Sequence, residues 1–112
     1  ALNQFDFMRK SELDLQTRPV DWKQEKLKNL IPLSEVAKHN KRHDCWMVLG
    51  GNVYDVTSYL AYHPGGKGEL LRGAGKDATD LYNEVHAWVS YDAILKSVLI
   101  GRLAPRSLDL SQ

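Results

Sequence analysis

The stretch His63-Pro64-Gly65-Gly66 decides how this chain folds, because it imposes a sharp corner on the backbone. Pro64 disfavours the helical conformation at the residue before it, and the two glycines permit backbone angles that other residues resist. Residues 57–62 before the corner predict a short helix, and residues 69–71 after it predict a helical turn. The corner therefore fixes one imidazole between two helical segments.

A second histidine, His86, lies at the end of a longer helical pattern. Asp77 is a good N-cap for that helix, and Tyr82 and Val85 give it an apolar side near its end. Both histidines thus lie at helix boundaries among apolar or aromatic neighbours. Each could be a buried structural histidine, but two of them in such settings favour a shared ligand.

Two imidazoles beside an apolar slot suit haem better than zinc. Zinc sites use three or four protein ligands, and the further candidates, His43 and Cys45, lack metal-ligand spacing with the pair. Haem iron needs two axial ligands from the protein, because the porphyrin supplies the other nitrogens. We expect His39 to be a solvated helix cap and His43 to lie in a charged loop.

The remaining pattern predicts an α+β fold, in which a small mixed sheet and two helical pairs enclose the slot. Residues 45–49 and 53–56 read as strands, joined by the turn signal Gly50-Gly51-Asn52. The turn makes these two strands a hairpin. Further elements are expected at residues 32–39 (helix), 91–98 (helix) and 99–103 (strand).

The chain of 112 residues is expected to form one domain with flanking segments. Residues 1–29 are polar, with six basic and five acidic side chains and no strict period, so we expect an extension that is partly ordered at most. Two alternatives remain open for this extension: the stretch Pro19 to Trp22 docks on the core, or the extension is a free arm. The compact domain is expected at residues 30–104, followed by a C-terminal tail or linker at residues 105–112.

Composition argues against several classes of function. The net charge is +1 and 26% of residues are charged, without the basic stripe of a nucleic-acid binder. No apolar run reaches the roughly 18 residues of a transmembrane segment. We also expect the domain to be a monomer. Cys45 is the only cysteine, so no internal disulfide can form, and a cofactor is the better candidate for stabilising a small core. A single free cysteine also favours a reducing, cytosol-facing compartment.

The residues around both histidines resemble the cytochrome b5 domain over about residues 30–104. The resemblance rests on the HPGG corner, the run Ala74-Gly75-Lys76-Asp77-Ala78-Thr79, the second histidine and the closing Ile100-Gly101-Arg102-Leu103. It implies one non-covalent haem b, with His63 and His86 as the axial ligands of the iron. The apolar haem pocket that it implies consists of Leu49, Val56, Tyr59, Leu70, Tyr82 and Val85, with Ile94, Leu95 and Val98 as additions.

The segment Glu84-Val85-His86-Ala87-Trp88 departs from the family pattern, which places Gly before the second ligand and Ser after it. His86 follows His63 by 23 positions, one fewer than is usual in the family. We therefore expect the His86 ring to be rotated, with the two imidazole planes closer to perpendicular. Trp88 is expected to shield the haem edge or to pack on the following helix.

These local features look most like the b5 domain of the soluble fused cytochrome b5/cytochrome b5 reductase flavohaemoproteins. That resemblance implies an FAD reductase domain in the same full-length chain, which would supply electrons from NAD(P)H, and an unidentified downstream acceptor. The domain by itself is then an electron carrier and not an enzyme. Its expected location is cytoplasmic, with association with the endoplasmic reticulum as a variant. The alternative is a regulatory module that binds haem or a small ligand.

Charge between the two histidines is nearly balanced, with four acidic and three basic side chains over residues 67–84. Long-range steering of a partner should therefore be weak. A tethered partner needs little steering, because linkage supplies effective concentration. This balance agrees with the fused arrangement.

Overall fold

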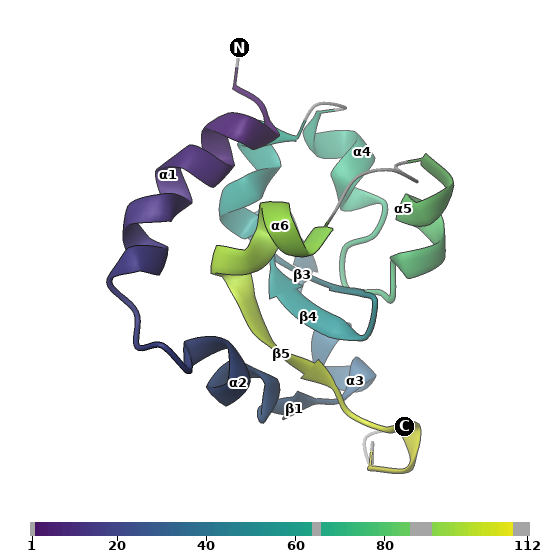
Figure 1. Ribbon diagram of the computed structural model, residues 1–112. Helices are drawn as coiled ribbons and strands as arrows, with labels where there is room; N and C mark the ends of the chain where they lie inside the picture. The colour runs from purple at the N-terminus through teal and green to yellow at the C-terminus, as the bar shows by residue number, and fades with distance from the viewer. Residues whose placement is uncertain (1, 64–65, 86–90, 109–112) are drawn as a thin grey trace.

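The computed structural model describes residues 2–63, 66–85 and 91–108, in which a five-stranded sheet in the order β1-β5-β4-β3-β2 is surrounded by helices (Figure 1). The expected α+β class is confirmed. The strands are β1 (Leu30–Ile31), β2 (Asn40–Lys41), β3 (Asp44–Leu49), β4 (Asn52–Asp55) and β5 (Leu99–Leu103). The α-helices are α1 (Gln4–Gln16), α2 (Trp22–Leu27), α3 (Leu33–Val36), α4 (Lys67–Leu71), α5 (Thr79–Val85) and α6 (Tyr91–Leu95). The 3-10 helices are η1 (Thr57–Tyr62), η2 (Lys96–Val98) and η3 (Arg106–Leu108).

The hairpin of β3 and β4 forms where the turn signal predicts it. Gly50 and Gly51 have φ angles of +60° and +83°, which favour glycine, and a turn of this kind matches the twist of paired strands. Leu49 pairs with Asn52 on either side of the turn. β5 then pairs antiparallel with β4, and β1 lies parallel to β5, which makes the sheet mixed.

Alternation along β3 gives the sheet two apolar faces. Cys45, Met47 and Leu49 belong to a large hydrophobic cluster, whereas Val48 belongs to a smaller one, against which Trp46 packs. The large cluster includes side chains from the helices that follow the hairpin. These helical members are Tyr59, Leu60, Leu70, Tyr82 and Leu95.

Residues 1–29 contain two helices that the sequence analysis did not predict. α1 lies beside η1 and α6 (Figure 1), and its Phe7 is 3% exposed within the large cluster. A capping box starts the helix: the Asn3 side chain accepts from the backbone N–H of Asp6, and the Asp6 carboxylate accepts from that of Asn3. Trp22 of α2 packs against the same cluster, which favours docking over a free arm. The proposed domain limit at residue 30 stays a prediction.

Residues 75–78 run along β3 and are hydrogen-bonded to it. The Gly75 N–H donates to the Trp46 carbonyl (2.7 Å), and the Val48 N–H donates to the Lys76 carbonyl (2.9 Å). The Ala78 N–H then donates to the Val48 carbonyl (2.9 Å). The sheet therefore fixes the point at which α5 begins.

Candidate functional site

His63 ends η1 and faces the large hydrophobic cluster. Its φ and ψ angles of −70° and 126° are extended, as expected for a residue before proline. The side chain is buried, with 8% exposed. Its Nδ1–H donates to the carbonyl of Gly66 at 3.1 Å, and Gly66 itself has a φ of +88°, an angle that favours glycine. The corner thus places a hydrogen-bond acceptor against one side of the imidazole.

This hydrogen bond determines what the ring can do chemically. When Nδ1 carries the proton of a neutral imidazole, Nε2 has the lone pair that a metal ion requires. A backbone carbonyl on the other nitrogen is the usual means of orienting a metal-binding histidine. Among the described residues no three His, Cys, Asp or Glu side chains gather into a metal site. An imidazole oriented in this way by the Gly66 carbonyl fits haem iron, which takes only its axial ligands from the protein.

Two tyrosines pack edge-on against His63. The centroid of the Tyr59 ring lies 6.1 Å from that of His63, and the centroid of Tyr82 lies 6.5 Å away. The Tyr82 hydroxyl donates to the Leu70 carbonyl at 2.6 Å, which joins α5 to α4. Burial raises the pKa of Tyr59 to about 12 and also raises the pKa of Tyr82, so both stay neutral phenols near pH 7.

The structure brings most of the predicted pocket residues together. Six of them are buried in the large cluster beside His63: Leu49, Val56, Tyr59, Leu70, Tyr82 and Leu95. Ile94 and Val98 are partly buried and pack against it. Val85 is the last residue of α5, whereas His86 and Trp88 lie outside the described residues. Their assignment to a haem site, and the rotation of the His86 ring, stay predictions.

Phe7 is a residue near the site that the sequence analysis missed. Its ring packs edge-on against Tyr59 and Tyr62, with centroids 5.0 Å and 5.3 Å away. Because Tyr59 also contacts His63, α1 supports the histidine indirectly, through Tyr59. The sequence signal that could have revealed the start of α1 was the capping box, since Asn3 is followed three residues later by Asp6.

The expectation that His39 is a solvated cap is wrong. Its ring stacks on Trp46 with 3.5 Å between centroids and 7° between planes. Nδ1 lies 2.8 Å from the nearer carboxylate oxygen of Asp44, and Nε2 lies 2.9 Å from that of Glu35. Burial opposes the charged ring, but the hydrogen bonds to Asp44 and Glu35 outweigh it and raise the pKa of His39. His39 thus joins α3 to β3.

The family described as "Cytochrome b5-like Heme/Steroid binding domain" matches residues 32–104, and the chain belongs to it. Among curated proteins, "Cytochrome b5 reductase 4" of Mus musculus is 57% identical over 70 residues, which is 62% of this chain and 13% of that protein. The Xenopus tropicalis protein of the same name is 50% identical over 78 residues, 70% of this chain and 15% of that protein. "Cytochrome b5 isoform B" of Arabidopsis thaliana is 42% identical over 79 residues, 70% of this chain and 59% of that protein.

Solved structures agree with the family assignment. Cytochrome b558 of Ectothiorhodospira vacuolata, titled a prokaryotic homologue of cytochrome b5, is 36% identical, with a TM-score of 0.57. The match covers 67% of this chain and 100% of that one. Cytochrome b5 of Ostreococcus tauri virus 2 is 35% identical, with a TM-score of 0.55 over 66% of this chain and 83% of that one. The fold is therefore that of a cytochrome b5, as the sequence predicted.

The matched segment spans a small part of the reductase relatives, 13% of the mouse protein and 15% of the frog protein. Similarity over this segment therefore does not assign the activity of those whole proteins to this chain. Over the described residues, no helix combines the length and apolar character needed to cross a membrane.

Proposed function

We propose that this domain binds one haem b non-covalently, through His63 and His86, and transfers single electrons. Bound haem iron supplies the one-electron redox chemistry. The observation that carries the proposal is His63 itself, a buried imidazole whose Nδ1–H is held by the Gly66 carbonyl at 3.1 Å. Membership of the cytochrome b5-like family supports the same conclusion.

The apolar cluster beside His63 is proposed to enclose the haem and to exclude water from it. Tyr59 and Tyr82 stay neutral, so they add no charge next to the iron. His63 and His86 would both hold the iron, which would then supply one-electron chemistry without binding a substrate. The proposed lining is Leu49, Val56, Tyr59, Leu70, Tyr82, Val85, Trp88, Ile94, Leu95 and Val98.

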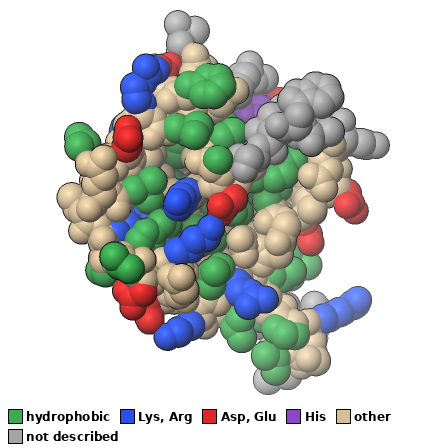
Figure 2. Space-filling view, in the orientation of Figure 1, with side chains coloured by type: hydrophobic (Ala, Val, Ile, Leu, Met, Phe, Trp, Pro, Cys, Tyr) green, Lys and Arg blue, Asp and Glu red, His purple; other side chains and the backbone are tan. Residues whose placement is uncertain are grey.

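The proposed electron donor is an FAD-containing, NAD(P)H-dependent reductase domain, carried in the same full-length chain. The support is the similarity to proteins named cytochrome b5 reductase 4. The domain itself is proposed to be a cytoplasmic monomer that turns over no substrate alone. Side-chain charge agrees, since Figure 2 shows Lys and Arg interspersed with Asp and Glu over the face in view, without a large field of one sign.

The absorption spectrum of the purified chain with added haem tests this function. We expect a six-coordinate, low-spin ferric form, and a reduced form that does not bind carbon monoxide readily. His63→Ala and His86→Ala should each give a high-spin or haem-free protein, because each removes one axial ligand. His43→Ala is the matched control, since His43 is exposed and should leave the spectrum unchanged.

Three outcomes would count against the proposal. A reduced wild-type protein that readily binds carbon monoxide has an open axial position. A spectrum unaffected by either histidine substitution would remove both from the ligand set. A chain that takes up no haem would favour the alternative of a module for another small ligand.

A further inference from the structure

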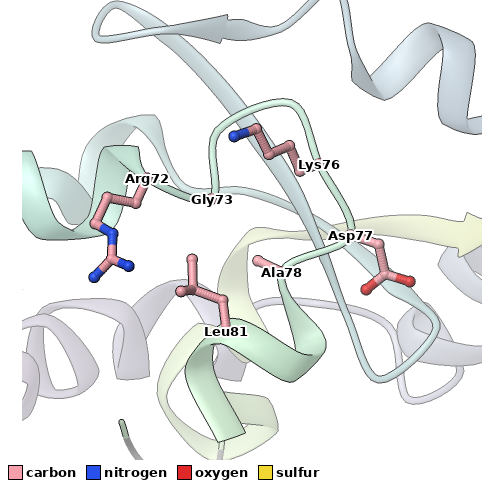
Figure 3. A pocket seen from close by; sticks show the side chains of 6 residues that line it. All are labelled: Arg72, Gly73, Lys76, Asp77, Ala78 and Leu81. Carbon is pink, nitrogen blue, oxygen red and sulfur yellow. The ribbon is translucent and has the colours of Figure 1, made fainter. Parts of the chain in front are cut away.

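A surface pocket lies between the end of α4 and the first turns of α5, outside the proposed haem lining. Its volume is about 380 Å³, and Figure 3 shows Arg72 and Lys76 on opposite sides of Gly73, with the Leu81 side chain pointing toward them from α5. The pocket therefore combines two cationic side chains with an apolar wall. Its lining residues are Arg72, Gly73, Lys76, Asp77, Ala78 and Leu81.

Two carboxylates near this pocket already have partners within the protein. Glu69 pairs with Arg72 at 2.7 Å. The Asp77 carboxylate accepts from the backbone N–H and the hydroxyl of Thr79 (3.1 and 2.6 Å), and in Figure 3 it points away from the two cations. The ammonium group of Lys76 has no ion pair with any carboxylate in the described part of the chain. Lys76 is thus the cation at the pocket that is available to an incoming anion.

The floor of the pocket is closely packed. A Cβ on Gly73 would lie 2.7 Å from the Ala78 Cβ and 2.9 Å from Cε2 of Tyr82, so the Gly73 backbone packs directly on both residues. The hydrogen bonds from residues 75–78 to β3 hold the opposite side. A partner would therefore meet a preformed surface, which lowers the entropic cost of binding.

The position of the pocket relates it to electron transfer. Tyr82 forms part of the surface behind Gly73, and its ring packs edge-on against His63 with 6.5 Å between centroids. A group that docks in the pocket is therefore separated from the proposed iron ligand by the Tyr82 ring. A partner held there would lie near His63, the proposed iron ligand.

We propose that this pocket docks an acidic side chain of the electron-transfer partner, with the carboxylate at Lys76 and its methylene groups against Leu81. The description of the partner as an electron-transfer protein rests on the proposed function, whereas recognition of a carboxylate does not. Charge over the segment between the two histidines is nearly balanced, so this contact would act only at short range and would set the orientation of the docked partner.

Fluorescence anisotropy of a labelled oligoglutamate peptide tests the proposal on the purified chain at low ionic strength, where charge contacts are least screened. We expect saturable binding that Lys76→Glu weakens by roughly fivefold or more, because the substitution reverses the charge beside the carboxylate. Lys41→Glu is the matched control, since Lys41 is exposed on β2 and makes the same change in net charge. It should change affinity less than about twofold.

Equal loss of affinity in the Lys76→Glu and Lys41→Glu proteins would overturn the proposal, as would a peptide that does not bind. Free glutamate that competes as well as the peptide at equal carboxylate concentration would instead identify a small-molecule carboxylate site and exclude a docked protein segment. An unchanged haem spectrum in the Lys76→Glu protein would show that the substitution affects peptide docking without affecting haem binding. A wild-type chain that takes up haem but does not bind the peptide refutes the docking site alone, whereas a wild-type chain that binds the peptide but shows no haem spectrum refutes the proposed function alone.

Discussion

At the scale of single residues, burial makes the one cysteine unreactive. Cys45 lies in β3 with no exposed surface, and burial, together with Asp55 and Asp44, raises the pKa of its thiol to about 11. At pH 8 it is therefore both protonated and inaccessible. We expect a disulfide reagent such as dithionitrobenzoate to modify it only as fast as the domain unfolds. Rapid modification in buffer, at the rate measured in guanidinium chloride, would contradict this.

His39 makes stability depend on pH in a defined direction. Its pKa is raised in the folded chain, so its contribution is complete below the ordinary value of about 6.5 and is lost as pH rises through the raised value. The groups facing the ring are Asp44 and Glu35, and Lys38 also contacts Glu35. We expect His39→Gln to lower the melting temperature more at about pH 6 than at about pH 9. If circular dichroism shows that His39→Gln lowers the melting temperature equally at both pH values, the ring of His39 is neutral in the folded chain.

Sequence and structure diverge at His39 for a physical reason. Its spacing from Glu35 is four residues, which on a helix places the two side chains together. Its contacts with Asp44 and Trp46 arise because the chain reverses between β2 and β3, and no periodicity reports that reversal. His63 was easier to place, because Pro64 and Gly66 act on the backbone within three residues of it.

At the scale of elements, α1 is held to the domain mainly through Phe7. The side chain is 3% exposed, whereas Phe5 two positions earlier is 63% exposed. We expect Phe7→Ala to lower the free energy of unfolding by about 3 to 5 kcal/mol, because it leaves a cavity against Tyr59 and Tyr62. Phe5→Ala is the matched control and should change it by less than about 0.5 kcal/mol in urea titrations. Similar values for the two variants would mean that α1 does not stabilise the core.

The elements that could be predicted are those with local signals. The hairpin has two glycines at its turn, and η1 and α4 flank the proline-glycine corner. α1 had no clear period, because its contacts with η1 and η2 are spread over residues as different as Phe7 and Ser11, whose hydroxyl accepts a hydrogen bond from that of Ser97 at 2.9 Å. β1 is two residues long and pairs with β5 across about 70 positions, so it could not be found locally. Pairing at such separation depends on the whole fold.

At the scale of the whole molecule, the proposed haem would complete a small core. The radius of gyration of 13.7 Å is close to that of a compact domain of this length. The large cluster joins the sheet to α1, η1, α4, α5 and α6, so most elements meet on the side of the sheet that His63 faces. The proposed cofactor would thus contact the part of the core that connects the helices, and its binding should be coupled to global stability.

Haem removal is therefore expected to lower the melting temperature of the whole domain. A ligand that binds only the folded chain stabilises it by about 2.7 kcal/mol when its free concentration is 100 times its dissociation constant. For a domain of this size the loss corresponds to a shift of roughly 10 °C or more. Calorimetry of the haem-loaded and haem-free chains measures the shift, and the His63→Ala protein is the control that should show little response to haem. Equal melting temperatures for the loaded and empty wild-type chain would show that the apolar cluster is complete without the cofactor, and that its buried residues line no haem site.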